Sequence, residues 1–194
     1  LIYLGGQSVQ SSWNFFTIYR FNWSEKMIGI SLTVVGVLMG VVQAGLTRVV
    51  NPKLGNEKSI YLGLSLYIMG LVLFAFATEG WMMFAFLVPY CLGGICGPSL
   101  QSVISGYVPS NQQGELQGSL TSLMSLTTII GPLIMNSTFA YFTTEKAPFH
   151  FPGIHFLIGA VCTTLGFVLA YKVLSQKRNK KVMEVMEVVD TYEN

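Results

Sequence analysis

The chain has 194 residues, of which 10% are charged and 52% hydrophobic, and its formal net charge is +2. Typical soluble domains carry about 25% charged residues, so this chain has too few charges to cover a water-exposed surface. The composition also excludes disordered and collagen-like chains, and three cysteines are too few for a disulfide scaffold. A charge of +2 does not indicate a nucleic-acid partner. An integral membrane protein is the class that fits.

Six apolar stretches are long enough to cross a bilayer, which takes about 20 mostly apolar residues per helix. No Lys, Arg, Asp or Glu lies in the middle of any of them, and the gaps between them are short and polar. We therefore expect an all-α membrane protein with one transmembrane domain, 1–174, whose six helices cover about 1–19, 27–50, 59–78, 81–108, 116–142 and 152–174. The remaining residues, 175–194, form a basic and then acidic tail.

The cationic residues are divided unequally between the two sides of this predicted bundle. Three of them lie in the gaps after the first, third and fifth spans: Arg20, Lys26 and Lys146. The other eight lie on the opposite side, including those of the tail. Because Lys and Arg concentrate on the cytoplasmic side of membrane proteins, both ends of the chain are expected in the cytoplasm. The basic part of the tail is a solvated flank or a contact to anionic lipid.

Polar residues are concentrated in some of the spans. In the first span, Gln7, Gln10, Asn14 and Thr17 follow the three-four-three spacing of one helix face. The fifth span begins with Ser and Thr, whereas the third and sixth are almost wholly apolar. Since polar groups are costly in lipid, the first and fifth spans are expected to line the interior and the third and sixth to face outward.

Glutamine and asparagine side chains are the candidate substrate-binding groups, because their donors and acceptors need partners inside a membrane. Gln43 lies in the second span and Gln101 in the fourth. The alternative role is to join helices through hydrogen bonds. We predict a substrate cavity that includes Gln7, Gln10, Asn14, Gln43 and Gln101.

Glycine and proline interrupt two spans. The string Gly93-Gly94-Ile95-Cys96-Gly97-Pro98 lies in the fourth, and Gly131-Pro132 lies in the outer half of the fifth. Proline removes a backbone hydrogen bond and kinks a helix, and interrupted helices are typical of the moving parts of transporters. Close packing through small residues is the alternative. The residues expected to mark kinks or gates are Gly97, Pro98, Gly131 and Pro132.

Two similar strings suggest an internal repeat. Gly29-Ile30-Ser31-Leu32-Thr33 opens the second span, and Gly118-Ser119-Leu120-Thr121 opens the fifth. Each of these spans is the middle helix of a set of three. Two three-helix sets of opposite orientation form the 3+3 inverted repeat of a transporter half.

No catalytic or metal-binding pattern is present. Ser99 lacks the G-x-S-x-G surroundings of an exposed nucleophile, and the acidic residues are scattered over the gaps. No glycine-rich loop is followed by the lysine of a phosphate site. We therefore expect neither an enzyme nor a bound metal or cofactor.

Three strings, in order along the chain, resemble the tetracycline-efflux branch of the major facilitator superfamily. They are Arg20-Phe21-Asn22-Trp23 with the following Ile28–Leu32, Leu73–Trp81, and Val108-Pro109 through Gly131-Pro132-Leu133 with its internal Gln113-Gly114-Glu115-Leu116-Gln117-Gly118. The chain is similar to the C-terminal half, helices seven to twelve of a twelve-helix carrier. The resemblance implies proton-coupled export of a small amphipathic molecule by alternating access, a drug-resistance activity of the bacterial inner membrane.

The resemblance also implies partners and residue roles. The partner would be an N-terminal six-helix half of the same protein. Arg20 would lie at the outer end of the first helix, and Gln43 would face substrate in the second. Met39 and Tyr67 stand where these exporters carry a histidine and a membrane aspartate. The six spans thus lack a buried carboxylate, so either the N-terminal half carries protons or coupling differs. A membrane sensor or assembly module with the carrier fold is the alternative function.

Overall fold

The computed structural model describes residues 1–144 and 147–193, with side chains described as far as Gln176. The all-helical fold predicted from the sequence is confirmed, since the described residues form helices and short connections without a strand. The long elements are α1 (Ile2–Gln10), α2 (Trp13–Phe21), α3 (Glu25–Val41), α4 (Thr47–Leu54), α5 (Asn56–Ala75), α6 (Gly80–Leu92), α7 (Cys96–Ser105), α8 (Gln113–Thr143) and α9 (Ile154–Glu193). Three short turns complete them: η1 (Val42–Leu46), η2 (Gly93–Ile95) and η3 (Ser110–Gln112).

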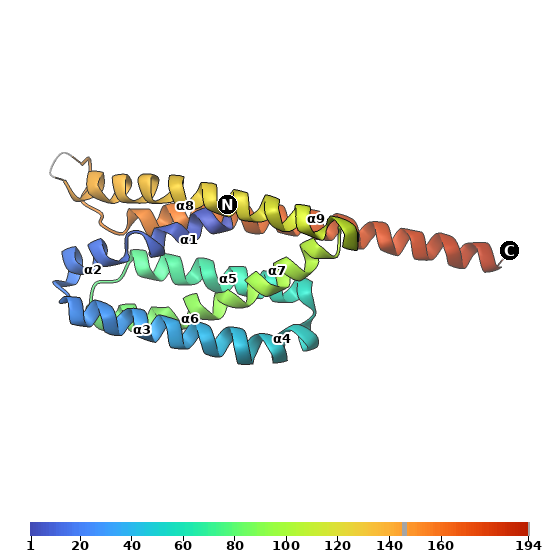
Figure 1. Cartoon of the computed structure of the whole chain (residues 1–194), viewed down its shortest axis with the longest axis horizontal. Helices are drawn as coiled ribbons and strands as arrows, with labels where there is room; N and C mark the ends of the chain where they lie inside the picture. Colours follow the sequence, from blue (N-terminus) through green and yellow to red (C-terminus); the bar gives the residue numbers. More distant parts are fainter. Residues whose placement is uncertain (145–146, 194) are drawn as a thin grey trace.

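Five helical segments within the described residues are long and apolar enough to cross a membrane. They are Glu25–Leu54, Asn56–Ala75, Gly80–Ser105, Ser110–Thr143 and Ile154–Gln176. The first expected span, 1–19, instead consists of the nine-residue helices α1 and α2, separated at Ser11 and Ser12. The start of the chain lies beside Gly166, about halfway along the apolar part of α9, so this first segment does not run the full length of the bundle (Figure 1).

Consecutive long segments run in opposite directions, so the connections alternate between the two ends of the bundle (Figure 1). The connections 22–24 and 76–79 lie at one end together with the described residues 144 and 147–153, and Gly55 and the segment 106–112 lie at the other. Arg20 and Lys26 belong to the first end, whereas Lys53 and Lys58 belong to the second. Lys146 and the side chains of the tail beyond Gln176 lie outside the described residues.

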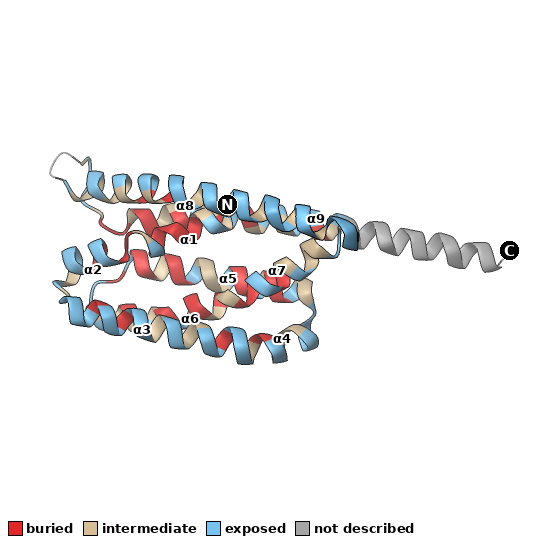
Figure 2. Ribbon diagram, in the orientation of Figure 1, coloured by how far each residue is buried: buried red, intermediate tan, exposed pale blue. Residues whose placement is uncertain are grey.

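The apolar third span is at the centre of the bundle rather than at its outside. Helix α5 packs against α6, α7 and α9, and α1 lies between α8 and α9. The most apolar window of α5 is 44% buried, compared with 11% for the fifth span, which includes α8 (Figure 2). The expectation that the third span faces outward is therefore wrong, whereas the sixth, with 33% of its most apolar window buried, lies between these two values. Lipid and protein interior are both apolar, so composition does not distinguish an inner from an outer helix.

Small residues allow the central helices to approach closely. A Cβ atom at Gly63 would lie 2.7 Å from the Cys96 backbone nitrogen, and one at Gly93 would lie 2.7 Å from Tyr67 Cβ. Gly5 of α1 and Gly159 of α9 face each other in the same way across their own contact. Without a hydrophobic effect between helices in lipid, such close packing supplies much of the attraction.

An aromatic cluster joins α2, α5, α6 and α9 near the end where α2 lies. The rings of Trp13 and Phe74 meet edge to face at 5.3 Å, as do those of Phe16 and Phe156 at 5.0 Å. Trp13 Nε1 also donates a 3.0 Å hydrogen bond to the Ser31 hydroxyl of α3. Edge-to-face pairs add stability beyond their buried area, so this cluster holds α2 firmly on the bundle.

Candidate functional site

The polar residues of the first span occupy two different environments. Gln7 and Thr17 are buried, whereas Gln10 and Asn14 are exposed in this chain. The Gln7 side chain packs on α8, where a Cβ atom at Gly131 would lie 2.7 Å from Gln7 Cβ. The expectation of one continuous polar face is wrong, because the break at Ser11 and Ser12 interrupts the helical rotation between Gln7 and Asn14.

The break between α1 and α2 is held by hydrogen bonds of its two serines. Ser11 Oγ donates to the Gln7 carbonyl at 2.6 Å, and the buried Ser12 Oγ donates to Asn136 Oδ1 of α8 at 2.8 Å. Serine hydroxyls that hydrogen-bond to nearby backbone groups offer the chain an alternative to regular helical hydrogen bonding. Discontinuous membrane helices typically form the substrate and ion sites of transporters. Asn136 was not among the predicted site residues. The sequence feature that could have indicated it is its isolated amide side chain within the apolar run of the fifth span.

A second irregular region includes Gln43. The π-helical turn η1 follows α3, and the Val42 carbonyl accepts hydrogen bonds from the Thr47 backbone N–H and, at 3.0 Å, from the Thr47 hydroxyl. Gln43 lies in this turn and is exposed. Single π-helical turns within α-helices occur frequently at functional sites.

The turns η1 and η2 are neighbours, so two irregular segments from adjacent spans meet. A Cβ atom at Gly94 would lie 3.1 Å from Met39 Sδ and 4.0 Å from Val42 Cγ1. A larger residue at position 94 would require the Met39 side chain to shift by a few tenths of an ångström, so glycine suits this contact. The region therefore combines an interrupted fourth span, an interrupted second span and Gln43.

The predicted interruption of the fourth span is present, but it lies just before Gly97 and Pro98. The 3-10 turn η2 separates α6 from α7, and Gly97 and Pro98 fall in the first turn of α7, where both are exposed. Proline is tolerated in a first helical turn because its missing N–H has no helical partner there. In the fifth span, α8 continues through Pro132, and the buried Gly131 serves the contact with Gln7.

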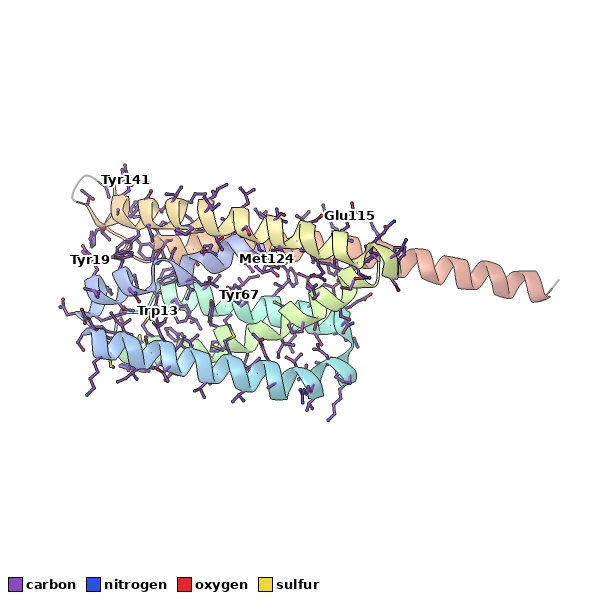
Figure 3. The ribbon with its side chains drawn as sticks, in the orientation of Figure 1. Trp13, Tyr19, Tyr67, Glu115, Met124 and Tyr141 are labelled. Carbon is purple, nitrogen blue, oxygen red and sulfur yellow. The ribbon has the colours of Figure 1, made fainter. Side chains whose placement is uncertain are left out.

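Tyr67, at the position where the resemblance implies an aspartate, lies inside the bundle (Figure 3). Its ring stacks on Tyr90 with centroids 4.8 Å apart, and the two hydroxyl oxygens are 3.3 Å apart. Tyr67 also packs on Gly93, so it borders the interruption of the fourth span. Gln101 is half-buried in α7.

Arg20 lies in the last turn of α2, as the resemblance implies for an outer helix end. It borders a cavity of about 170 Å³ together with Phe16, His150 and the segments 75–78 and 151–153. Asn22 ends α2 in the left-handed conformation, with φ of 51°. The left-handed cap turns the chain sharply towards α3.

Long apolar helices, a discontinuous first span and two irregular turns in contact are features typical of membrane transport proteins. The chain belongs to the Major Facilitator Superfamily, whose sequence profile matches residues 1–187. It is thus an integral membrane protein of a transporter family, as the quoted strings suggested.

Several relatives are tetracycline resistance proteins. The class C protein of Escherichia coli is 42% identical over 72% of this chain and 35% of its own length. The class G protein of Vibrio anguillarum is 40% identical over 69% of this chain and 34% of its own length. The class H protein of Pasteurella multocida is 35% identical over 88% of this chain and 42% of its own length. Their sequence identity confirms the resemblance to the tetracycline-efflux branch. These relatives are about twice as long as this chain, so part of their length is unmatched.

Proposed function

We propose that this chain is the C-terminal half of a secondary active transporter that exports a small amphipathic compound by proton antiport with alternating access. The names and lengths of the relatives support this proposal. The transporter would act in a bacterial inner membrane and would contain an N-terminal six-helix half as the partner of this chain. In the proposed orientation, the connections that include Gly55 and 106–112 face the cytoplasm, as does the C-terminal end of the chain, because cationic residues favour that side. Leu1 lies beside Gly166, partway along the bundle, on the side of α1 nearer to the cytoplasm.

The substrate cavity would lie between the two halves, where carriers of this kind bind their substrates near the midplane. Gln10, Asn14 and Gln43 are exposed in this chain, and polar amides facing lipid are costly. A water-filled cavity beside a second half removes that cost. The observation that carries the proposal is the position of Gln43 in the π-helical turn that contacts η2. Gln101 is the fourth proposed substrate-binding residue. Gln7 instead packs α1 on α8 through its contact with Gly131.

The same contact between η1 and η2 is suited to movement. Alternating access requires parts of a carrier to rock or bend around a fixed site. Both turns have fewer regular α-helical hydrogen bonds than the segments on either side, so bending there disturbs less structure. Gly97 and Pro98 lie in the first turn of α7, just after η2, and would act as the gate residues of the fourth span.

The proton carrier would lie in the N-terminal half. In the part of this chain whose side chains the structure describes, the acidic residues are found at helix starts and in connections: Glu25, Glu57, Glu79 and Glu115. None of these four is a carboxylate at mid-membrane, where desolvation would bring its proton affinity into the range that antiport needs.

The substitution Gln43→Leu in the intact carrier tests the site. We expect unchanged thermal stability and membrane level, but a half-saturation concentration about tenfold higher in substrate-stimulated proton flux, the effect of losing one hydrogen bond. Vesicles containing the carrier would be tested with tetracycline and with uncharged aromatic drugs. The matched control is Thr33→Val in α3, because the exposed Thr33 hydroxyl bonds only to the Gly29 carbonyl of its own helix.

Two results would contradict the proposal. If Gln43→Leu lowers stability and yield while affinity per folded molecule is unchanged, Gln43 joins helices instead of binding substrate. If no compound drives proton flux through the intact carrier, the antiport mechanism is wrong and a sensor or assembly role is favoured.

A further inference from the structure

A cavity of about 360 Å³ lies between α2 and α8. It is lined by Phe15, Asn136, Phe139, Ala140 and Thr143. Its volume falls within the range of about 300–1,000 Å³ typical of small-molecule sites, and its lining combines apolar walls with few polar groups, as such sites do. The cavity is separate from the region around η1 and η2, and the sequence prediction contains none of its lining residues.

The two phenylalanines give the cavity aromatic walls. Phe15 projects from α2 with 56% of its side chain exposed. Phe139 is held in position by edge-to-face contacts on two sides, with ring centroids 5.4 Å from His155 and 5.9 Å from Tyr19. Tyr19 is itself within hydrogen-bond distance of His150, with 3.3 Å between the hydroxyl and Nε2. One wall is therefore preorganised, which lowers the entropic cost of binding a planar ring.

Asn136 is the polar group of the cavity. Its Oδ1 accepts the 2.8 Å hydrogen bond from Ser12, which fixes the orientation of the amide. The two Nδ2 hydrogens make no hydrogen bond to the residues that the structure describes, although Asn136 is half-buried. Nδ2 is not enclosed by protein, so a ligand in the cavity can reach it. A ligand that brings an acceptor oxygen is favoured, because binding would otherwise remove water from this donor without replacing its hydrogen bond.

We propose that this cavity is a subsite for an uncharged aromatic ring system that bears a carbonyl or similar oxygen acceptor. The ring stacks between Phe15 and Phe139, and the oxygen accepts a hydrogen bond from Asn136 Nδ2. Since none of the five lining residues is charged, a charged group is not stabilised there. A flat aromatic wall and a directed donor fit this ligand better than a lipid acyl chain. The subsite rests on the proposed transport function, because its ligand would be the exported compound.

The test uses benzophenone, a diaryl ketone that cross-links to nearby C–H bonds under ultraviolet light, with the intact carrier in lipid nanodiscs. We expect saturable labelling of peptides from α2 and the last two turns of α8. Phe15→Ala, which removes an exposed ring and leaves the core untouched, should raise the half-saturation concentration about threefold to tenfold. Asn136→Leu should do so by a similar factor. The control is Leu133→Ala on α8, which is 67% exposed and lies outside the cavity lining.

The possible outcomes separate the subsite from its alternatives. Labelling elsewhere, or labelling at the cavity that neither Phe15→Ala nor Asn136→Leu weakens, overturns the proposal. Labelling that rises linearly with benzophenone means that the groove is merely open to lipid. A cross-link from a photoreactive amino acid at position 15 to the N-terminal half means that protein fills the cavity, which also overturns it. If labelling is saturable but the carrier shows no proton flux, the subsite is supported and only the antiport mechanism is refuted.

Discussion

The contact between α5 and α6 at Gly70 offers a quantitative test of the fold. A Cβ atom at Gly70 would lie 2.7 Å from Tyr90 Cβ and 2.8 Å from Tyr90 Cα. Carbon atoms in contact prefer about 3.5–4.0 Å, so Gly70→Ala must push the two helices apart by about 1 Å at this point. The atoms that must move belong to backbone and Cβ positions, which cannot turn aside as a flexible side chain could.

The size of the effect follows from two opposing terms. Overpacking in a close contact costs about 1–3 kcal/mol, and a separation of this size also weakens the stacking of Tyr67 on Tyr90. Alanine is better than glycine inside a helix by about 0.5–1 kcal/mol. The net loss in unfolding free energy is therefore about 1–2 kcal/mol. For a chain of this size, that loss corresponds to a decrease in melting temperature of about 2–8 °C.

A thiol-reactive dye measures this unfolding in the intact carrier, because Cys91 and Cys96 are buried and become reactive as the bundle opens. A Cys162→Ala background removes the partly exposed thiol. The control is Gly36→Ala in α3, where no atom lies within 4 Å of the added Cβ. It should leave the melting temperature unchanged or raise it slightly, since alanine favours the helix. Equal melting of the two variants, or higher stability of Gly70→Ala, would refute the packing described for α5.

Two further predictions concern topology and autonomy. In a cysteine-free carrier, Glu79→Cys should react with an impermeant thiol reagent added outside intact cells, whereas Asn111→Cys should react only after the membrane is opened; the reverse pattern contradicts the charge-based orientation. Cells that express residues 1–194 alone should show no drug export, because the cavity requires both halves; export by the fragment, without homodimers, contradicts the two-half site.

The amino-acid sequence by itself determined the fold class, most of the long helices and the family. Apolar length is a local property, so each run of about 20 residues predicts a span without reference to its neighbours. The interruption at Gly93–Ile95 could be predicted for the same reason, since glycine and proline act on their own backbone. The strings around Arg20 and Gln113–Gly118 identified the family without the structure.

Only the tertiary structure decided which faces of these helices pack against one another. The polar spacing of the first span predicts one unbroken face, but Ser12 bonds to Asn136, which lies 124 residues away, and the helix breaks there. Gly131 similarly has a packing role only because the Gln7 side chain lies directly against it. The central position of α5 could not be predicted from its composition, because an apolar side chain is equally suited to lipid and to another helix. Contacts between residues distant in the sequence, rather than local preference, determine which helices lie inside the bundle and which residues line the cavity between α2 and α8.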